Sequence, residues 1–141
     1  MNDIHNLNRF LDAQNPVYES VLNELKNARK QGHWMWFIFP QIVGLGKSPT
    51  ARTFAIKSTD EAKAYWKHPV LGARLRECTS ILLELQDPSA EQIFGYPDVL
   101  KFRSSMTLFA SITENQLFQD ALDKFYDGKP DPLTLKILRS L

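Results

Sequence analysis

The sequence predicts an all-α fold, in a single compact domain of about seven mostly short helices. Apolar residues recur at three- and four-residue spacing, as on the buried face of a helix, and no stretch shows the sustained alternation of a strand. In addition, a polar residue is followed by proline ahead of a helix-like segment at Asn15-Pro16, Ser48-Pro49, His68-Pro69, Asp87-Pro88 and Asp131-Pro132. Proline suits the first helical position because its missing N–H would have no partner there.

The first helix is expected after Pro16, and Gly32 is expected to end it. Its apolar residues share one face, at Val17, Val21, Leu22, Leu25 and Ala28. The next segment, residues 33–40, is apolar and aromatic but too short for periodicity to separate a strand from a helix. Because a lone strand would leave its backbone polar groups unpaired, we expect a short helix or an irregular buried segment there.

Further helices are expected after Pro49, Pro69 and Pro88, and over residues 98–110. The helix after Pro69 carries apolar residues at Leu71, Leu75, Cys78, Leu82 and Leu85. Thr113 and Gln116 have the spacing of a capping box, which predicts a helix over residues 117–125 that Gly128 ends. A last helix is expected over residues 132–138.

The composition is typical of one globular domain. The 141 residues are 43% hydrophobic and 23% charged, which excludes a disordered chain. We expect one domain over residues 1–141, with a core large enough to need no disulfide or metal. The 17 basic and 16 acidic side chains leave a net charge of +1 without a block of like charges. This balance argues against binding of nucleic acid or of an anionic membrane, which normally rests on a basic excess.

The sequence also indicates where the protein resides. Its most apolar run, residues 34–39, is too short to cross a bilayer, and the first residues lack the basic and apolar regions of a signal peptide. Cys78 is the single cysteine and has no partner within the chain, which suits a reducing compartment. We therefore expect a cytoplasmic protein in which Cys78 is a buried structural thiol.

The loop GLGKS at residues 44–48 is the first candidate binding site. It follows an apolar run and precedes a helix start, as a phosphate-binding P-loop does, but Gln41 stands where that motif requires its first glycine. We expect instead an anion site formed by the amides around Gly44 and Gly46, by Lys47 and Ser48, and by the positive end of the following helix. The alternative is an ordinary loop with a solvated lysine and a serine cap.

The second candidate site is the aromatic stretch beside this loop, where His33, Trp34, Trp36 and Gln41 interleave polar tips with large rings. Buried tryptophan needs a partner for its indole N–H, so this stretch is either core or a ligand platform. Trp34 and Trp36 cannot share a helix face, and therefore at most one of them lines a pocket. We expect Trp36 to belong to the core and place Trp34 in the candidate site.

The third candidate is the basic and hydroxyl-rich stretch that starts at Lys101. On a helix, Lys101 and Ser105 share a face, and a desolvated lysine can activate a serine hydroxyl. The alternative is that these small residues permit close helix packing, so no catalytic residue is assigned. Arg52, in the helix after the loop, adds a positive charge. The histidines lack metal-ligand spacing, and neither a metal nor a cofactor is expected.

Five strings of the sequence carry a resemblance to a known family: AQNPVY at 13–18, HWMWFIFPQ at 33–41, GLGKS at 44–48, HPVLG at 68–72 and KFRSSMTLF at 101–109. They resemble a bacterial domain-of-unknown-function family, numbered eighteen-ten, that has often been labelled calpastatin. The resemblance covers nearly the whole chain and implies an all-α domain found alone in small cytosolic bacterial proteins, without an established reaction or cofactor. The calpastatin label does not suit this sequence, because that inhibitor is a long disordered chain.

Two functions are compatible with these patterns. In the first, which we favour, the aromatic stretch, the glycine loop and the Lys101 segment converge on one pocket that binds a small anionic, nucleotide- or phosphate-bearing ligand. In the second, the same residues form the core, and the domain is a non-catalytic protein–protein interaction module that uses an exposed helix face. No pattern in the sequence specifies an oligomeric state.

Overall fold

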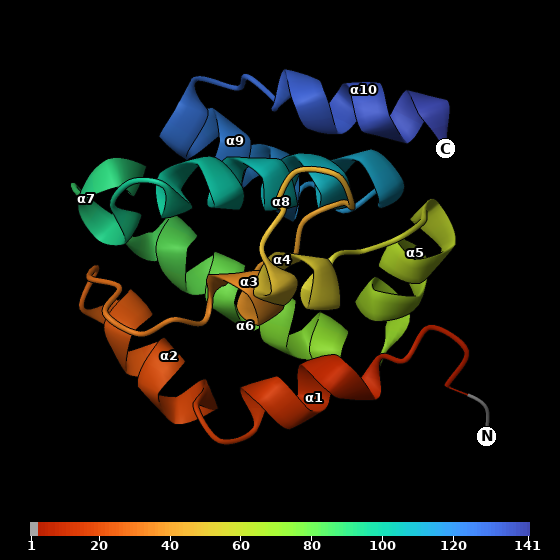
Figure 1. The fold of residues 1–141 in the computed structure, drawn as a ribbon. Helices are drawn as coiled ribbons and strands as arrows, with labels where there is room; N and C mark the ends of the chain where they lie inside the picture. The colour runs from red at the N-terminus through yellow and green to blue at the C-terminus, as the bar shows by residue number, and fades with distance from the viewer. Residues whose placement is uncertain (1–2) are drawn as a thin grey trace.

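The computed structural model describes residues 3–141 and is all-helical, in one compact domain (Figure 1). Within these residues the chain forms ten helices: α1 (Asn8–Gln14), α2 (Tyr18–Lys26), α3 (Met35–Ile38), α4 (Pro49–Phe54), α5 (Thr59–Lys67), α6 (Leu71–Glu84), α7 (Ala90–Phe94), α8 (Asp98–Ile112), α9 (Leu117–Tyr126) and α10 (Pro132–Ser140). None of the helices in this part of the chain is long and apolar enough to span a membrane.

Helix α8 lies at the centre of the helical packing. It contacts α9 most extensively and also packs against α3, α5, α7 and α10, while α6 packs against α2, α5 and α9. In Figure 1, α10 runs above α8 at one side of the molecule, and α1 and α2 cover the opposite side. The short helices α3 and α4 lie between these layers, so the loop that joins them reaches α8 from the side.

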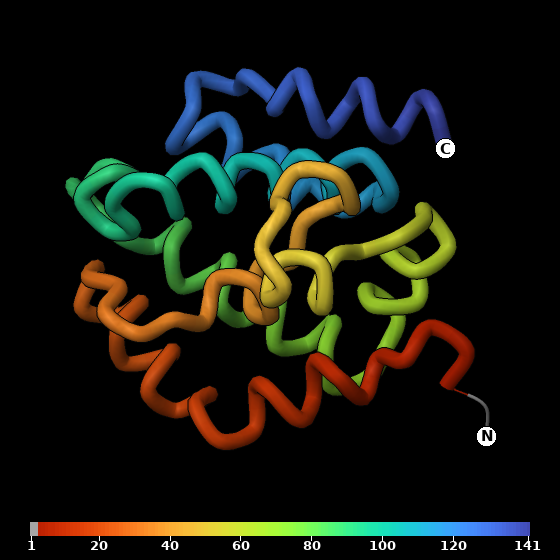
Figure 2. Tube along the Cα trace, viewed as in Figure 1, coloured from red at the N-terminus to blue at the C-terminus, as the bar shows by residue number. Residues whose placement is uncertain are grey.

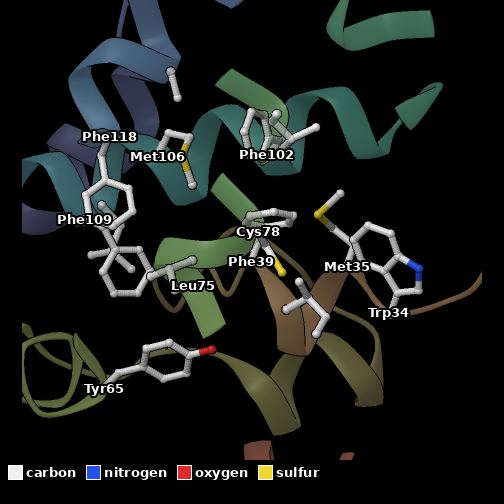
Figure 3. Packing of buried hydrophobic residues seen from close by; sticks show 14 of the residues in the cluster. Trp34, Met35, Phe39, Tyr65, Leu75, Cys78, Phe102, Met106, Phe109 and Phe118 are labelled. Carbon is white, nitrogen blue, oxygen red and sulfur yellow. The ribbon is translucent and has the colours of Figure 1, made fainter. Parts of the chain in front are cut away.

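The core is rich in aromatic rings, several of which meet edge to face (Figure 3). Phe39 meets Phe102 at 4.9 Å between ring centroids, and Phe109 stands 5.6 Å from Phe118. Cys78 is fully buried, and burial raises the pKa of its thiol to about 12. The expectation of a buried cysteine is therefore confirmed, and the raised pKa disfavours the reactive thiolate near neutral pH.

The proline pattern marks helix starts correctly. Helices α2, α4, α6, α7 and α10 begin within two residues of Pro16, Pro49, Pro69, Pro88 and Pro132. The predicted side-chain caps hold for α4 and α10, where Ser48 and Asp131 accept the amides of Ala51 and Thr134. At α7 the cap is Ser89, in a capping box with Gln92, rather than the residue before the proline.

Three helices exceed the expected number of about seven. Helix α3 lies in the segment for which a short helix was one of two alternatives, and α1 and α5 begin without a proline signal. Helix α1 starts where the Asp3 carboxylate accepts the amides of Leu7 and Asn8, at 2.7 and 2.9 Å. Helix α5 starts where the Ser58 hydroxyl accepts the amide of Glu61 at 3.0 Å.

Two predicted helix boundaries are wrong, the end of α2 and the start of α9. Helix α2 ends at Lys26, well before Gly32, because Ala28 takes the left-handed conformation at φ +55°. Helix α9 is not started by a capping box of Thr113 and Gln116, since Thr113 caps the end of α8 instead. The Asn115 side chain accepts a hydrogen bond from the amide of Leu117 at 2.9 Å, so Asn115 rather than Thr113 supplies the side-chain acceptor at the start of α9.

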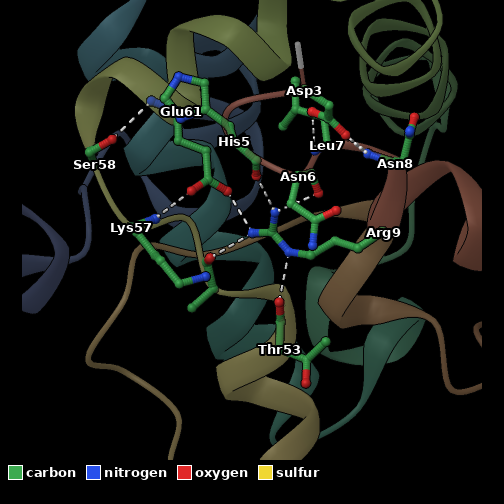
Figure 4. Close-up of polar contacts among 11 residues, drawn as sticks. Asp3, His5, Asn6, Leu7, Asn8, Arg9, Thr53, Lys57, Ser58 and Glu61 are labelled. Atoms are coloured by element: carbon green, nitrogen blue, oxygen red, sulfur yellow. Dashed lines mark hydrogen bonds and ion pairs between the residues drawn. The ribbon is translucent and has the colours of Figure 1, made fainter.

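The Arg9 guanidinium on α1 holds the connection between α4 and α5 in place (Figure 4). It donates to the carbonyl oxygens of Thr53 and Ala55, at 2.7 and 3.0 Å, and pairs with the buried Glu61 carboxylate at 2.5 Å. The other Glu61 oxygen accepts the amide of Lys57 at 3.2 Å. This network fixes the end of α4, and with it one end of the loop described next.

Candidate functional site

A cavity of about 420 Å³ opens between the α3–α4 loop, the first turns of α8 and the start of α10. Figure 2 shows the loop as an arch whose tip lies beside α8. The cavity is lined by Trp36 of α3, by Gln41, Leu45, Gly46, Lys47, Ser48 and Ala51 of the loop and α4, by Pro97, Leu100, Lys101, Arg103 and Ser104 around α8, and by Asp131 and Leu133 at the start of α10.

The base of the loop is closed by backbone hydrogen bonds. Ile42 and Ile56 form an isolated parallel bridge, in which the amide of Val43 donates to the Ile56 carbonyl at 2.8 Å and the amide of Ile56 donates to the Gln41 carbonyl at 2.9 Å. Both isoleucines are buried, so the two ends of the loop are anchored in the core while its tip faces the cavity.

Gly46 allows the loop to fold back onto α4. A Cβ placed on Gly46 would stand 2.5 Å from the Cβ of Ala51, which is closer than side-chain carbons approach each other. A glycine is therefore required by close packing at this position. Gly46 and the neighbouring Lys47 both line the cavity.

The loop tip offers unpaired backbone donors. None of the five successive amides of residues 44–48 donates a hydrogen bond to an acceptor in the described part of the chain. Lys47 is exposed and forms no ion pair with the residues at 3–141. The Ser48 hydroxyl oxygen accepts the amide of Ala51 at 3.1 Å, which leaves its own proton free to donate.

Trp36 and Lys101 form one wall of the cavity. The Trp36 side chain is half-buried, and the Lys101 ammonium lies 4.6 Å from the centroid of its ring, within cation–π distance. Asp98 holds Lys101 loosely, at 3.6 Å, because its other carboxylate oxygen pairs more closely with Lys30 at 2.6 Å. Lys101 therefore keeps most of its hydrogen-bonding capacity beside the ring.

Hydrogen bonds join the floor of the cavity to the turn before α10. The Arg103 guanidinium donates to the carbonyl oxygens of Lys129 and Pro130, at 2.9 Å each, and so ties α8 to the turn before α10. The Ser104 hydroxyl lies 3.2 Å from Oδ2 of Asp131. Because Lys47, Lys101 and Arg103 face a single carboxylate among the lining residues, the cavity is positively charged.

The structure brings together part of the set predicted from the sequence. Gln41, Gly46, Lys47, Ser48 and Lys101 all line the cavity. Trp36, which we expected in the core, lines it as well and is absent from the core cluster.

The remaining predicted residues lie outside the cavity. His33 and Arg52 are exposed elsewhere, and Gly44 packs toward Ile137 of α10 at φ +100°. Ser105 is fully buried on the inner face of α8, where its hydroxyl has no partner within the described residues. It does not share the cavity with Lys101, because the neighbouring Ser104 takes that position.

Trp34 is part of the core and is only 2% exposed. Its indole N–H donates to the Glu24 carboxylate at 3.0 Å, and the same oxygen accepts the amides of Gln31 and Gly32. Burial favours the neutral acid, but these three hydrogen bonds outweigh it and hold the pKa of Glu24 below its ordinary value. Trp34 thus has the buried, satisfied environment that we had expected for Trp36.

Several lining residues were not in the predicted set. Arg103 and Ser104 belong to the Lys101 segment, and Asp131 was predicted only as a helix cap. Leu100 and Leu133 are 50% and 60% exposed. Their exposure is evident only in the folded chain and could not be predicted from the sequence. No group of three or more His, Cys, Asp or Glu side chains suited to a metal ion occurs within residues 3–141.

Comparison with known proteins places the chain in a family. The sequence model of the family described as Protein of unknown function (DUF1810) matches residues 4–138. The chain is also similar to the conserved hypothetical protein Rv1873 from Mycobacterium tuberculosis, whose crystal structure superposes with a TM-score of 0.96 at 52% sequence identity, covering 97% of this chain and 99% of that one. The comparison with curated proteins found no match. The chain therefore belongs to the DUF1810 family.

Proposed function

We propose that the cavity binds a small phosphate-bearing molecule, such as a nucleotide. The observation that carries the proposal is the run of unpaired amides at residues 45–48, which include Lys47 and line a cavity of about 420 Å³. Phosphate oxygens accept several hydrogen bonds at once, and consecutive backbone N–H groups beside a lysine supply them. A volume of this size is typical of small-molecule sites.

The rest of the lining suits the organic part of such a ligand. The Trp36 ring offers a flat apolar surface, and Leu45, Leu100 and Leu133 add aliphatic walls. Phosphate at the loop tip and a planar group near Trp36 would use both halves of the cavity. The positive ends of α8 and α10, whose N-cap residues Pro97 and Asp131 line the cavity, add favourable potential for an anion.

A protein-interaction module is the second candidate, favoured by the exposure of Leu100 and Leu133 at the cavity. An apolar partner that covered these leucines would also bury Lys47 and the loop amides without acceptors. Buried unpaired donors cost about 1–3 kcal/mol each, which opposes such an interface. The mixed lining is better matched to a small ligand that carries both an anion and an apolar group.

Titration calorimetry with pyrophosphate and with AMP tests the proposal. We expect Lys47→Ala to weaken binding of both probes about tenfold or more, since a charge-assisted hydrogen bond is lost. Lys63→Ala is the matched control, because Lys63 is an exposed lysine on α5 outside the cavity. Both variants should melt at nearly the wild-type temperature.

Two results would contradict this function. One is a wild-type protein that binds neither probe at millimolar concentration, as judged by calorimetry and by the absence of a ligand-induced shift in Tm. The other is binding that Lys47→Ala and Lys63→Ala reduce equally, which would place the anion outside the loop.

A further inference from the structure

Asp131 is the only carboxylate among the described residues that line the cavity. A negative charge in a site otherwise rich in donors repels an anionic ligand, unless the carboxylate itself receives a hydrogen bond from that ligand. At the start of α10 the carboxylate caps the helix, and the positive end of the helix favours its charge. Capping uses only one of the two carboxylate oxygens.

The geometry of Asp131 separates its two oxygens. Oδ2 accepts the Thr134 amide at 3.0 Å and lies 2.6 Å from the Thr134 hydroxyl and 3.2 Å from that of Ser104. The Asp131 amide donates to the Thr107 hydroxyl at 2.8 Å, which fixes the backbone. Oδ1 accepts no hydrogen bond from any residue in the described range 3–141. Oδ2 thus caps α10, while Oδ1 is held in place and has no hydrogen-bond donor among the described residues.

We infer that Oδ1 of Asp131 accepts a hydrogen bond from a hydroxyl group of the ligand, and that the ligand is a phosphate ester of a polyhydroxyl compound. This inference rests on the proposed function. Lys47, Lys101 and Arg103 outnumber the single carboxylate of Asp131, so the net positive charge of the cavity disfavours a cationic ligand group. A neutral hydroxyl supplies the missing donor without adding a fourth positive charge.

The shared chemistry is a hydroxyl near a phosphate, which occurs both in the ribose of a nucleotide and in a free sugar phosphate. Rejection of an analogue that lacks the hydroxyl is expected to be strong, because Oδ1 would be left without a partner. Asp131 would then determine specificity, whereas the loop at 44–48 would supply affinity for the phosphate. Each residue can be tested with its own probes.

The experiment measures affinities by calorimetry for pyrophosphate, ribose 5-phosphate, AMP and the dideoxy analogue of AMP that lacks both ribose hydroxyls. In the wild-type protein, AMP should bind about tenfold more tightly than its dideoxy analogue. A comparison of ribose 5-phosphate with AMP distinguishes a sugar phosphate from a nucleotide as the ligand. If the ligand is a sugar phosphate, ribose 5-phosphate should bind as tightly as AMP although it lacks the base. The inference holds whether AMP or ribose 5-phosphate binds more tightly, provided that AMP binds more tightly than its dideoxy analogue.

Two variants of Asp131 separate the free oxygen from the cap. Asp131→Ser keeps a capping oxygen and removes Oδ1, and Asp131→Gly removes both oxygens at a cap position where glycine costs little. In both variants we expect AMP to fall to the affinity of its dideoxy analogue, and pyrophosphate to bind as well as before or more tightly. Melting temperatures show whether each variant is folded, and one folded variant is enough for the comparison.

The outcomes also distinguish the two proposals. Tight binding of pyrophosphate with equal affinity for AMP and its dideoxy analogue would overturn the role of Asp131 and leave the phosphate site standing. Asp131 variants that keep the wild-type preference for AMP would overturn it in the same way. Failure of the wild-type protein to bind any of these probes would overturn both.

Discussion

Trp34 and Trp36 are separated by one residue and have different surroundings. Trp34 is 2% exposed, and its indole N–H is bonded to Glu24, ten positions earlier in the chain. Trp36 is half-buried and faces the cavity under the Lys101 ammonium. Apolar neighbours surround both tryptophans in the sequence, so their hydropathy does not distinguish them.

We expect Trp34→Ala to lower the free energy of unfolding by about 3–5 kcal/mol, the usual cost of removing a large buried ring. Trp36→Ala should cost about 1 kcal/mol, because its ring lies at the cavity and outside the core cluster. It should also weaken AMP binding more than pyrophosphate binding. Urea unfolding checks the first pair of values and calorimetry the second. Equal destabilisation by the two substitutions would contradict this assignment.

At the residue scale, sequence patterns do not show which residues distant in the chain meet at the cavity. The loop residues Gly46, Lys47 and Ser48 were predictable, because their glycine, charge and cap act locally. Arg103 and Asp131 face the cavity only because α8 and the turn before α10 are bonded together, at Arg103 to Lys129 and Pro130. No spacing rule relates residues that far apart.

Among the elements, the connection between α4 and α5 depends on a single side chain of α1. Arg9 donates to the carbonyl oxygens of His5, Asn6, Thr53 and Ala55 and pairs with Glu61, while its guanidinium lies over the Phe10 ring at 4.3 Å. The Glu61 carboxylate at the other end is nearly fully buried. Such a pair stabilises the fold mainly through the cost of leaving either partner alone.

Arg9→Met should therefore lower the free energy of unfolding by about 3–5 kcal/mol, because Glu61 would remain as a buried charge without its partner. The double variant Arg9→Met with Glu61→Gln should recover part of this loss, since it removes the unpaired charge. Urea unfolding of the two single variants and the double variant measures the coupling. Strictly additive losses would show that the two side chains act independently.

Helix starts were predictable where the signal was local. Proline with a polar neighbour marks α4 and α10, and those caps form as predicted. Helices α1 and α5 use the side chains of Asp3 and Ser58 without proline, a pattern that the proline signal does not include. Helix α3 was ambiguous because a single turn of four residues is shorter than the periodicity needed to recognise it.

For the molecule as a whole, α8 is the structural centre, and its N-terminal end is also a wall of the cavity. Its middle, from Phe102 to Phe109, is almost entirely buried. The arch at residues 44–48 is at the other extreme, because most of its residues are exposed and its amides donate to no acceptor within the described residues. Stability is therefore distributed unevenly between the two sides of the same site.

Hydrogen exchange measured by NMR should show this gradient. The amides of residues 102–109 are expected to exchange only through global unfolding, and those of residues 44–48 at close to the rate of an unstructured peptide. Saturating pyrophosphate should slow the loop amides selectively, because they would become hydrogen-bonded to the ligand. Uniform slowing across the chain, without an excess at the loop, would indicate binding elsewhere.

The buried thiol of Cys78 provides a chemical probe of the opening of the whole molecule. It is the only sulfhydryl of the chain, and it is enclosed in the core with a pKa of about 12. A disulfide reagent such as Ellman's can reach it only after the surrounding helices separate, so the modification rate reports on the opening of unaltered protein. When opening and closing are fast relative to modification, that rate gives the population of the open form directly. Ligand occupancy, core substitutions and temperature can therefore be compared on one kinetic scale without attaching a dye or engineering a reporter.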